Sequence, residues 1–132
     1  KICIDYVEGN WLNAGLHDLG INTFCVQFQS GVTKRARAAK QSSASLGRRL
    51  RDEMFLDVKD LMEANKIFFS EDVLKNGLAH ELEVVGSEIK GQYLVVTEKS
   101  VIKERLAGKS CDLLDSLVLA VHSMFEFYQN DA

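Results

Sequence analysis

Apolar and polar residues follow two different periods in the first thirty positions of the chain. Residues 2–4 form an apolar run of strand type, and residues 21–28 alternate between apolar and polar side chains. Between them, after a turn at residues 8–10, the pattern predicts a helix from Trp11 to Leu19 that is closed by Gly20. Strand, helix and strand in so short a segment predict a β-α-β crossover with a parallel strand pair.

The remaining pattern alternates between helical and strand-like segments. It predicts, in order, a helix over about 46–64, a short edge strand over 66–69, a helix beginning at Ser70, a strand over 93–97, and a last helix from Asp112 to about Tyr128. Alternating elements of both kinds are typical of the α/β class. We therefore expect a single α/β domain over residues 1–132.

The composition of the chain excludes several classes of protein. Hydrophobic residues make up 46% of the 132 residues and charged residues 27%, which argues against global disorder. No apolar run is long enough to span a bilayer, so we expect no membrane partner. Cys3, Cys25 and Cys111 are widely spaced without a CxxC pair, which disfavours zinc ligation. We expect them to be small buried hydrophobic residues in a reducing compartment.

The formal net charge is −3, yet the basic residues are unevenly distributed. Seven of them, and no acid, fall between Gly31 and Arg51. Residues 31–46 combine part of this charge with small polar residues, a composition typical of a basic flexible loop. Such a loop suits contact with DNA phosphates, here through Lys34, Arg35 and Arg37. The alternative is a solvated charged surface without a partner.

Two aspartates open the last predicted helix, which is otherwise apolar. Asp112 and Asp115 are three residues apart and therefore share one helix face. Asp5 stands where the first strand leaves the sheet. Carboxylates brought together from a strand end and a helix start suit hard divalent cations, so we expect Asp5, Asp112 and Asp115 to be metal ligands and catalytic residues. For Asp112 alone, the alternative is a favourable charge at a helix N-terminus.

Several segments, in chain order, resemble the nuclease domain of phage and prophage terminase large subunits. Residues 51–55 (RDEMF) are similar to the family's "RAEMW" helix, and residues 78–82 followed by Gly91 are similar to the segment before its site. Residues 99–117 are similar to the family's closing signature, with its two lysines, arginine, glycine and paired aspartates. The resemblance implies an RNase H-like fold, a mixed sheet flanked by helices, that lacks its first strands.

The same resemblance implies an activity and partners. The family cuts DNA with two metal ions, Mg²⁺ or Mn²⁺, and Asp5, Asp112 and Asp115 match its later acids, whereas its first acid lies upstream of this sequence. We therefore expect an endonuclease domain that is weak by itself. Double-stranded DNA, a portal protein and a small terminase subunit are the implied partners, and the cytoplasm of the host cell is the implied location. Lys99, Lys103 and Arg105 would contact DNA, and a sheet edge left exposed would favour dimers.

Two other functions fit the same residues. One is an RNase H-like nuclease of the Holliday-junction resolvase type, and the other is a non-catalytic DNA-binding or assembly module with an incomplete site. Glu8 is a substitute acid if Asp5 is not used, and His122 is expected to be a core or rim histidine. No GxxxxGK[ST] segment occurs, so the ATPase half of a packaging motor is absent from this sequence.

Overall fold

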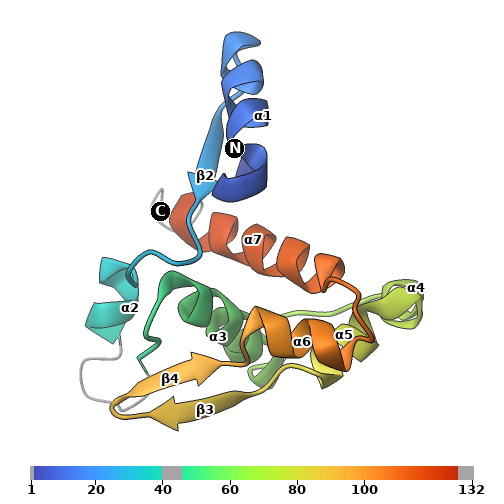
Figure 1. The fold of residues 1–132 in the computed structure, drawn as a ribbon. Helices are drawn as coiled ribbons and strands as arrows, with labels where there is room; N and C mark the ends of the chain where they lie inside the picture. The colour runs from blue at the N-terminus through green and yellow to red at the C-terminus, as the bar shows by residue number, and fades with distance from the viewer. Residues whose placement is uncertain (1, 40–45, 128–132) are drawn as a thin grey trace.

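The fold was analysed in a computed structural model that describes residues 2–39 and 46–127 (Figure 1). Helices and strands are both present, as expected for the α/β class. In chain order the elements are β1 (Ile2–Asp5), α1 (Tyr6–Asp18), β2 (Thr23–Val26), α2 (Lys34–Ala39), α3 (Leu50–Glu63), α4 (Glu71–Val73), η1 (Leu74–Leu78), α5 (Ala79–Glu83), β3 (Ser87–Lys90), β4 (Tyr93–Val96), α6 (Lys99–Arg105) and α7 (Asp112–Phe127).

The predicted β-α-β crossover is confirmed. β1 and β2 are parallel, with Ile2 opposite Thr23 and Asp5 opposite Val26, and α1 connects them. Gly20 ends the connection at φ 76, a conformation that favours glycine. The helix begins at Tyr6 rather than Trp11, so the predicted turn at residues 8–10 is wrong. Helix propensity is a weak preference, so Gly9 and Asn10 do not prevent a helix that follows β1 directly.

The strands form two separate pairs instead of one sheet. β3 and β4 make an antiparallel hairpin whose turn contains Gly91 at φ 65. Within the described residues neither strand of this hairpin joins β1 or β2, so a single mixed sheet is not formed there. The edge strand predicted over 66–69 is also wrong, because this segment has no strand partner. β3 escaped prediction because its four side chains are all exposed and carry no alternation.

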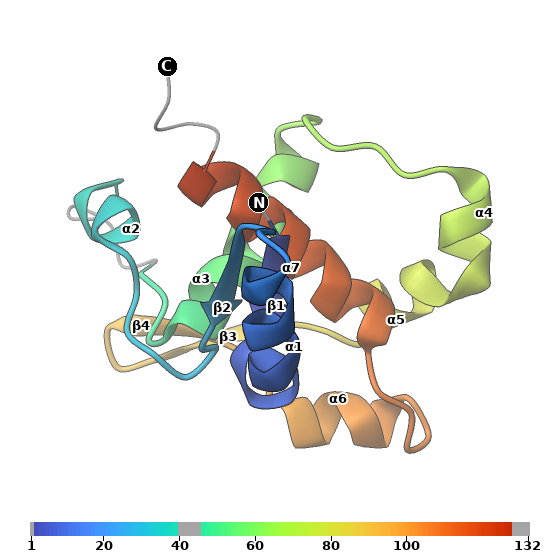
Figure 2. The same cartoon turned by 90° about the horizontal axis from the view of Figure 1, so that it is seen from above.

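The hydrophobic core lies between α3 and α7, with β4 against α3 (Figure 2). β1 packs on α7, and the β1–α1–β2 unit projects from that helix (Figure 1). Trp11 on this projecting unit is 76% exposed. The buried apolar residues of the core are Val26, Leu50, Met54, Phe55, Leu56, Val58, Leu78, Val96, Ile102, Leu106, Cys111, Leu114, Val118 and Val121.

α3 is shorter at its start than the sequence predicted. Residues 46–48 pair with Leu94 of β4 through backbone hydrogen bonds, so the helix begins only at Leu50. The first two N–H groups of α3 donate to carbonyls of the turn that follows β2. Leu50 N donates to Ser30 O at 2.7 Å, and Arg51 N donates to Phe28 O at 2.9 Å. These bonds satisfy donors that a helix cannot pair internally.

The basic segment is not a flexible loop throughout. Residues 34–39 form α2, so the loop prediction is wrong there, and residues 40–45 lie outside the described part of the chain. The Thr33 hydroxyl accepts a hydrogen bond from Ala36 N at 3.2 Å, which caps the helix start. The sequence Lys-Arg-Ala-Arg-Ala-Ala consists of strong helix formers. The loop prediction gave more weight to the small polar residues that follow in the sequence.

Apart from the unpredicted β3 and the absent strand over 66–69, the second half of the chain follows the predicted order. Ser70 caps α4 by accepting a bond from Val73 N, and η1 widens into a kink at Gly77, whose φ is 126. α6 and α7 are separated by Gly108 at φ 88, whose N–H donates to Lys103 O at 2.8 Å. In the described ranges no helix combines the length and apolar character that a bilayer crossing requires.

Asp52 provides a test of how α3 is joined to β4. Its buried carboxylate accepts hydrogen bonds from Arg49 N and Val96 N, each at 2.9 Å. Asp52→Ala leaves a buried N–H of β4 without an acceptor, and we expect the free energy of unfolding to fall by about 1–3 kcal/mol. Chemical denaturation measures this change. Glu63→Ala on the same helix is the control, because its exposed pair with Lys59 is worth at most about 0.5 kcal/mol.

Candidate metal centre

The first turn of α7 presents the two late aspartates. Leu114, Val118 and Val121 anchor one face of this helix in the core, so the rest of its first turn is held in place. Asp112 is exposed, whereas Asp115 is half-buried. Asp115 N donates to Cys111 O at 2.9 Å, which starts the helical hydrogen bonding. Negative side chains are favourable at this end of a helix because of its dipole.

Burial raises the pKa of the Asp115 carboxyl above its ordinary value. Lys99 and Arg51 oppose this rise, as does the Cys111 thiol, which donates to Asp115 Oδ1 at 3.5 Å. The same surroundings raise the pKa of the buried Cys111 thiol to about 11, mainly through desolvation and then through Asp115. Cys111 is therefore a neutral, unreactive thiol at neutral pH. A carboxylate whose pKa is changed by burial and by specific charged neighbours is a candidate for a functional residue.

A third acid reaches the same helix end from α5. Glu81 is buried, and its Oε1 accepts a hydrogen bond from Leu114 N at 3.2 Å. It also contributes to the raised pKa of Cys111, which places its charge near the start of α7. The sequence contained a signal for this residue, because an acid between apolar Leu78 and Leu82 lies on a helix face that is otherwise built for burial.

Asp5 is at the carboxyl end of β1, as predicted, and is half-buried. β1, however, packs on α7, and Ser123 in the later part of that helix is near enough to influence the pKa of the Cys3 thiol. Ser123 lies about 12 Å along the helix axis from Asp115. Within the described residues, Asp5, Asp112 and Asp115 do not form a group whose ligand atoms approach within 4.8 Å of one another. Their common role as metal ligands therefore stays a prediction.

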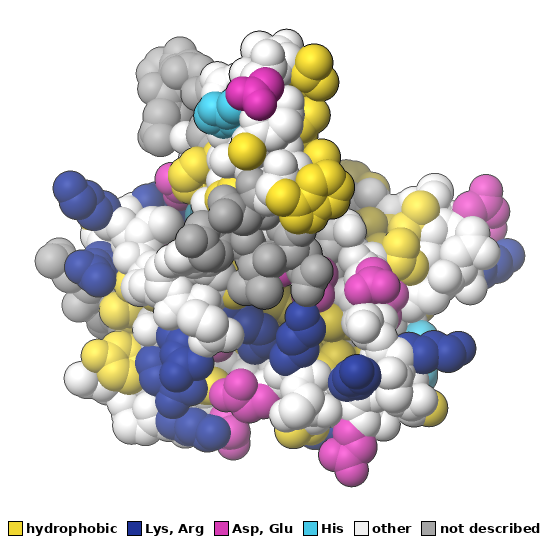
Figure 3. Space-filling view, turned by 45° about the horizontal axis from the view of Figure 1, so that its top comes forward, with side chains coloured by type: hydrophobic (Ala, Val, Ile, Leu, Met, Phe, Trp, Pro, Cys, Tyr) yellow, Lys and Arg dark blue, Asp and Glu magenta, His cyan; other side chains and the backbone are white. Residues whose placement is uncertain are grey.

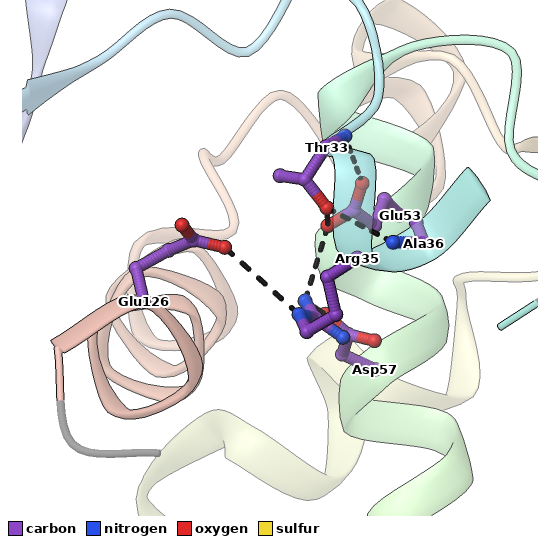
Figure 4. A network of polar contacts seen from close by, with 6 residues as sticks. All are labelled: Thr33, Arg35, Ala36, Glu53, Asp57 and Glu126. Atoms are coloured by element: carbon purple, nitrogen blue, oxygen red, sulfur yellow. Dashed lines mark hydrogen bonds and ion pairs between the residues drawn. The ribbon is translucent and has the colours of Figure 1, made fainter. Parts of the chain in front are cut away.

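The described residues contain one other group of ligand-type side chains, at the far end of α7. Ligand atoms of Glu53, His122 and Glu126 all lie within 4.8 Å of one another. Arg35 reaches the same place from α2 and pairs with Glu53 at 3.1 Å, with Asp57 at 3.0 Å and with Glu126 at 3.9 Å (Figure 4). The Arg35 guanidinium also lies 4.4 Å from the centre of the Phe125 ring. His122 is buried, as expected for a core histidine.

The sequence offered two signals for this second group. His122 and Glu126 are four residues apart on one helix and therefore share a face. Glu53 directly precedes the apolar residues 54–56. A buried carboxylate costs free energy unless it is paired and hydrogen-bonded, so the burial of Glu53 indicates a charged partner. Neither signal identifies Arg35 as that partner, because it belongs to a different element.

The predicted DNA-contacting residues separate into two groups. Lys34 and Arg37 on α2 and Lys99 and Lys103 on α6 are exposed. Arg35, in contrast, directs its guanidinium to the acids of α3. Arg105 on α6 donates to Val84 O at 2.9 Å and remains exposed. Lys and Arg side chains gather on the lower half of the face in Figure 3, with acidic side chains among them.

Comparisons with known proteins do not add to this description. No family model, no curated protein and no solved structure matches the chain.

The raised pKa of Asp115 predicts how stability depends on pH. The folded state holds this proton more tightly than the unfolded state, so ionisation removes stability as the pH rises from about 4 through the folded-state pKa. Asp115→Asn lacks the ionisable group. We therefore expect its free energy of unfolding, relative to the unmodified protein, to be higher at neutral pH than at about pH 3.

Denaturation at the two pH values measures this difference. Asp112→Asn is the matched control, because the exposed Asp112 carboxylate stays hydrated and its charge favours the helix N-terminus. If the free energy of unfolding of Asp115→Asn changed with pH in the same way as that of Asp112→Asn, the raised pKa of Asp115 would be contradicted.

Proposed function

We propose that this chain is a metal-dependent DNA endonuclease module of the terminase large-subunit type, with an RNase H-like fold. The observation that carries the proposal is the half-buried Asp115 carboxylate at the start of α7, with Asp112 on the same turn and Lys99 beside it. Aspartates are mostly exposed in proteins, and those that burial and neighbouring charges perturb are found most often at functional sites. The sequence resemblance supports the same two aspartates.

The donor set at this helix end fits a hard divalent cation. Asp112 and Asp115 offer carboxylate oxygens from one face, and Mg²⁺ or Mn²⁺ usually takes one or two such ligands and fills its other positions with water and phosphate. When bound, the ion would activate water and stabilise charge on a phosphodiester. Lys99 would hold a DNA phosphate beside the acids, and Glu81 would orient the first turn of α7 through Leu114 N.

Asp5 would complete the site only if β1 approached the start of α7. Without it, the two α7 aspartates supply ligands for one ion, and two-metal hydrolysis needs a carboxylate that bridges both ions. We therefore propose low activity for this chain by itself. Cytoplasmic action on double-stranded DNA, with portal and small-subunit partners, belongs to the same proposal.

One observation favours a second function. Asp5 lies apart from the α7 aspartates in the described residues, which is the arrangement expected of a non-catalytic DNA-binding module. Exposed lysines and arginines on α2 and α6 would serve that module equally well. Cleavage and DNA binding must therefore be measured separately.

Asp115→Asn tests the nuclease proposal. We expect weak plasmid nicking that requires Mn²⁺ and falls at least about tenfold in this variant, because a metal ligand is lost. Glu104→Gln, an exposed acid on α6, is the matched control and should nick like the unmodified protein. If nicking is absent from the unmodified protein, or is the same in Asp115→Asn, the nuclease proposal fails.

DNA binding is tested by its salt dependence. Lys99→Gln/Lys103→Gln and Lys34→Gln/Arg37→Gln should each weaken binding to duplex DNA without changing sequence preference. Each lost phosphate contact should reduce the slope of log K against log salt by about 0.9. Fluorescence anisotropy over a range of salt concentrations measures the slope. Lys75→Gln on η1 is the control, and slopes identical to it in both double variants would exclude these residues from the DNA surface.

A further inference from the structure

We infer that Glu53, His122 and Glu126 form a second divalent-cation site that suits a transition metal, and that the Arg35 guanidinium takes the place of the ion in this structure. This site lies at the opposite end of α7 from Asp112 and Asp115 and is independent of the proposed nuclease function. Its ligands come from α3 and α7, the two helices that enclose the core.

The spacing of the three side chains suits a common ion. Their ligand atoms lie within 4.8 Å of one another, and ligand atoms bound about 2 Å from one zinc-like ion are at most about 4 Å apart. A small closing movement would therefore bring them to bonding distance. Imidazole is a ligand that suits Zn²⁺ and similar transition metals, and carboxylate oxygens also bind such ions at about 2 Å.

His122 supplies an independent indication of a ligand. It is 2% exposed, and its Nδ1 has no hydrogen-bond partner among the described residues. A buried ring nitrogen without a partner costs free energy, and a metal ion is one group that would satisfy it.

Arg35 already behaves as a cation in this position. Its guanidinium pairs with Glu53 and Asp57 and lies 3.9 Å from Glu126, so it spans two of the three proposed ligands (Figure 4). Its Nε is buried without a hydrogen-bond partner in the described structure, which leaves this guanidinium incompletely satisfied. The side chain is 33% exposed, so it has a path to solvent. An ion that enters must therefore displace the Arg35 guanidinium. Glu53 would stay in place, because Thr33 N and Thr33 Oγ1 donate hydrogen bonds to its carboxylate.

Removing Arg35 should open the site to metal. The probe is Co²⁺, followed by calorimetry and by its visible absorption, which distinguishes nitrogen and oxygen ligands from thiolates. We expect Arg35→Gln to bind Co²⁺ at least about tenfold more tightly than the unmodified protein, without a sulfur-to-cobalt band. Adding His122→Asn to Arg35→Gln should reverse this gain by at least about tenfold.

Two matched variants separate this site from other ligands. In the Arg35→Gln background, His80→Asn removes an exposed histidine and Asp115→Asn removes the acid of the proposed nuclease site, and both should leave Co²⁺ binding unchanged. The proposal is overturned if Arg35→Gln gains no affinity, if His122→Asn does not reduce it, or if Asp115→Asn does.

Thermal unfolding covers the case in which Arg35→Gln is poorly folded. Ligands that bind only the folded state raise its melting temperature. Co²⁺ should therefore restore circular dichroism and raise Tm in Arg35→Gln more than in the unmodified protein, and should not do so in Arg35→Gln/His122→Asn. If Arg35→Gln remains unfolded in the presence of Co²⁺, the inference is wrong.

Discussion

The first two turns of α3 bury charged side chains, and the other elements are arranged to supply their partners. Arg51 donates to Thr97 O at 2.8 Å after β4, Asp52 accepts from Val96 N within β4, and Glu53 accepts from Thr33 N at 2.7 Å before α2. An unpaired buried charge costs several kcal/mol, so none of these elements can move away independently. The packing of β4 and α2 around α3 therefore follows from one short polar segment.

The same constraint explains why α7 has two different ends. Its middle is mostly apolar and lies against α3, so the ionisable groups of α7 are confined to the first turn and to the last two turns. The first turn contains Asp112 and Asp115 with Lys99 beside them, in contact with solvent. The last turns contain His122 and Glu126, which meet the buried acids of α3. The first turn combines an exposed acid with a half-buried one, whereas the group at the other end of α7 contains the buried Glu53 and His122.

Local patterns predicted the elements well where the signal was itself local. The capping role of Ser70 and the start of α7 at Asp112 depend on residues within a few positions of one another, and β1, α1 and β2 follow one another within one short segment. The predictions failed where a distant partner decided the outcome. Residues 46–48 have helical character but pair with Leu94, and residues 66–69 are apolar but have no neighbouring strand. β3 is exposed along its length, and among the described strands it pairs with β4.

The candidate sites divide along the same line. The sequence by itself determined that Asp112 and Asp115 share one face at a helix start, because helical spacing is a local property. Only the tertiary structure decided that Glu81 reaches that turn, that β1 packs on α7 with Cys3 near Ser123, and that Arg35 turns inward to Glu53 and Asp57 instead of outward to a partner. These outcomes depend on which helices and strands pack together. That choice is made by burial of apolar surface and pairing of buried charge over the whole chain, which no short segment of sequence contains.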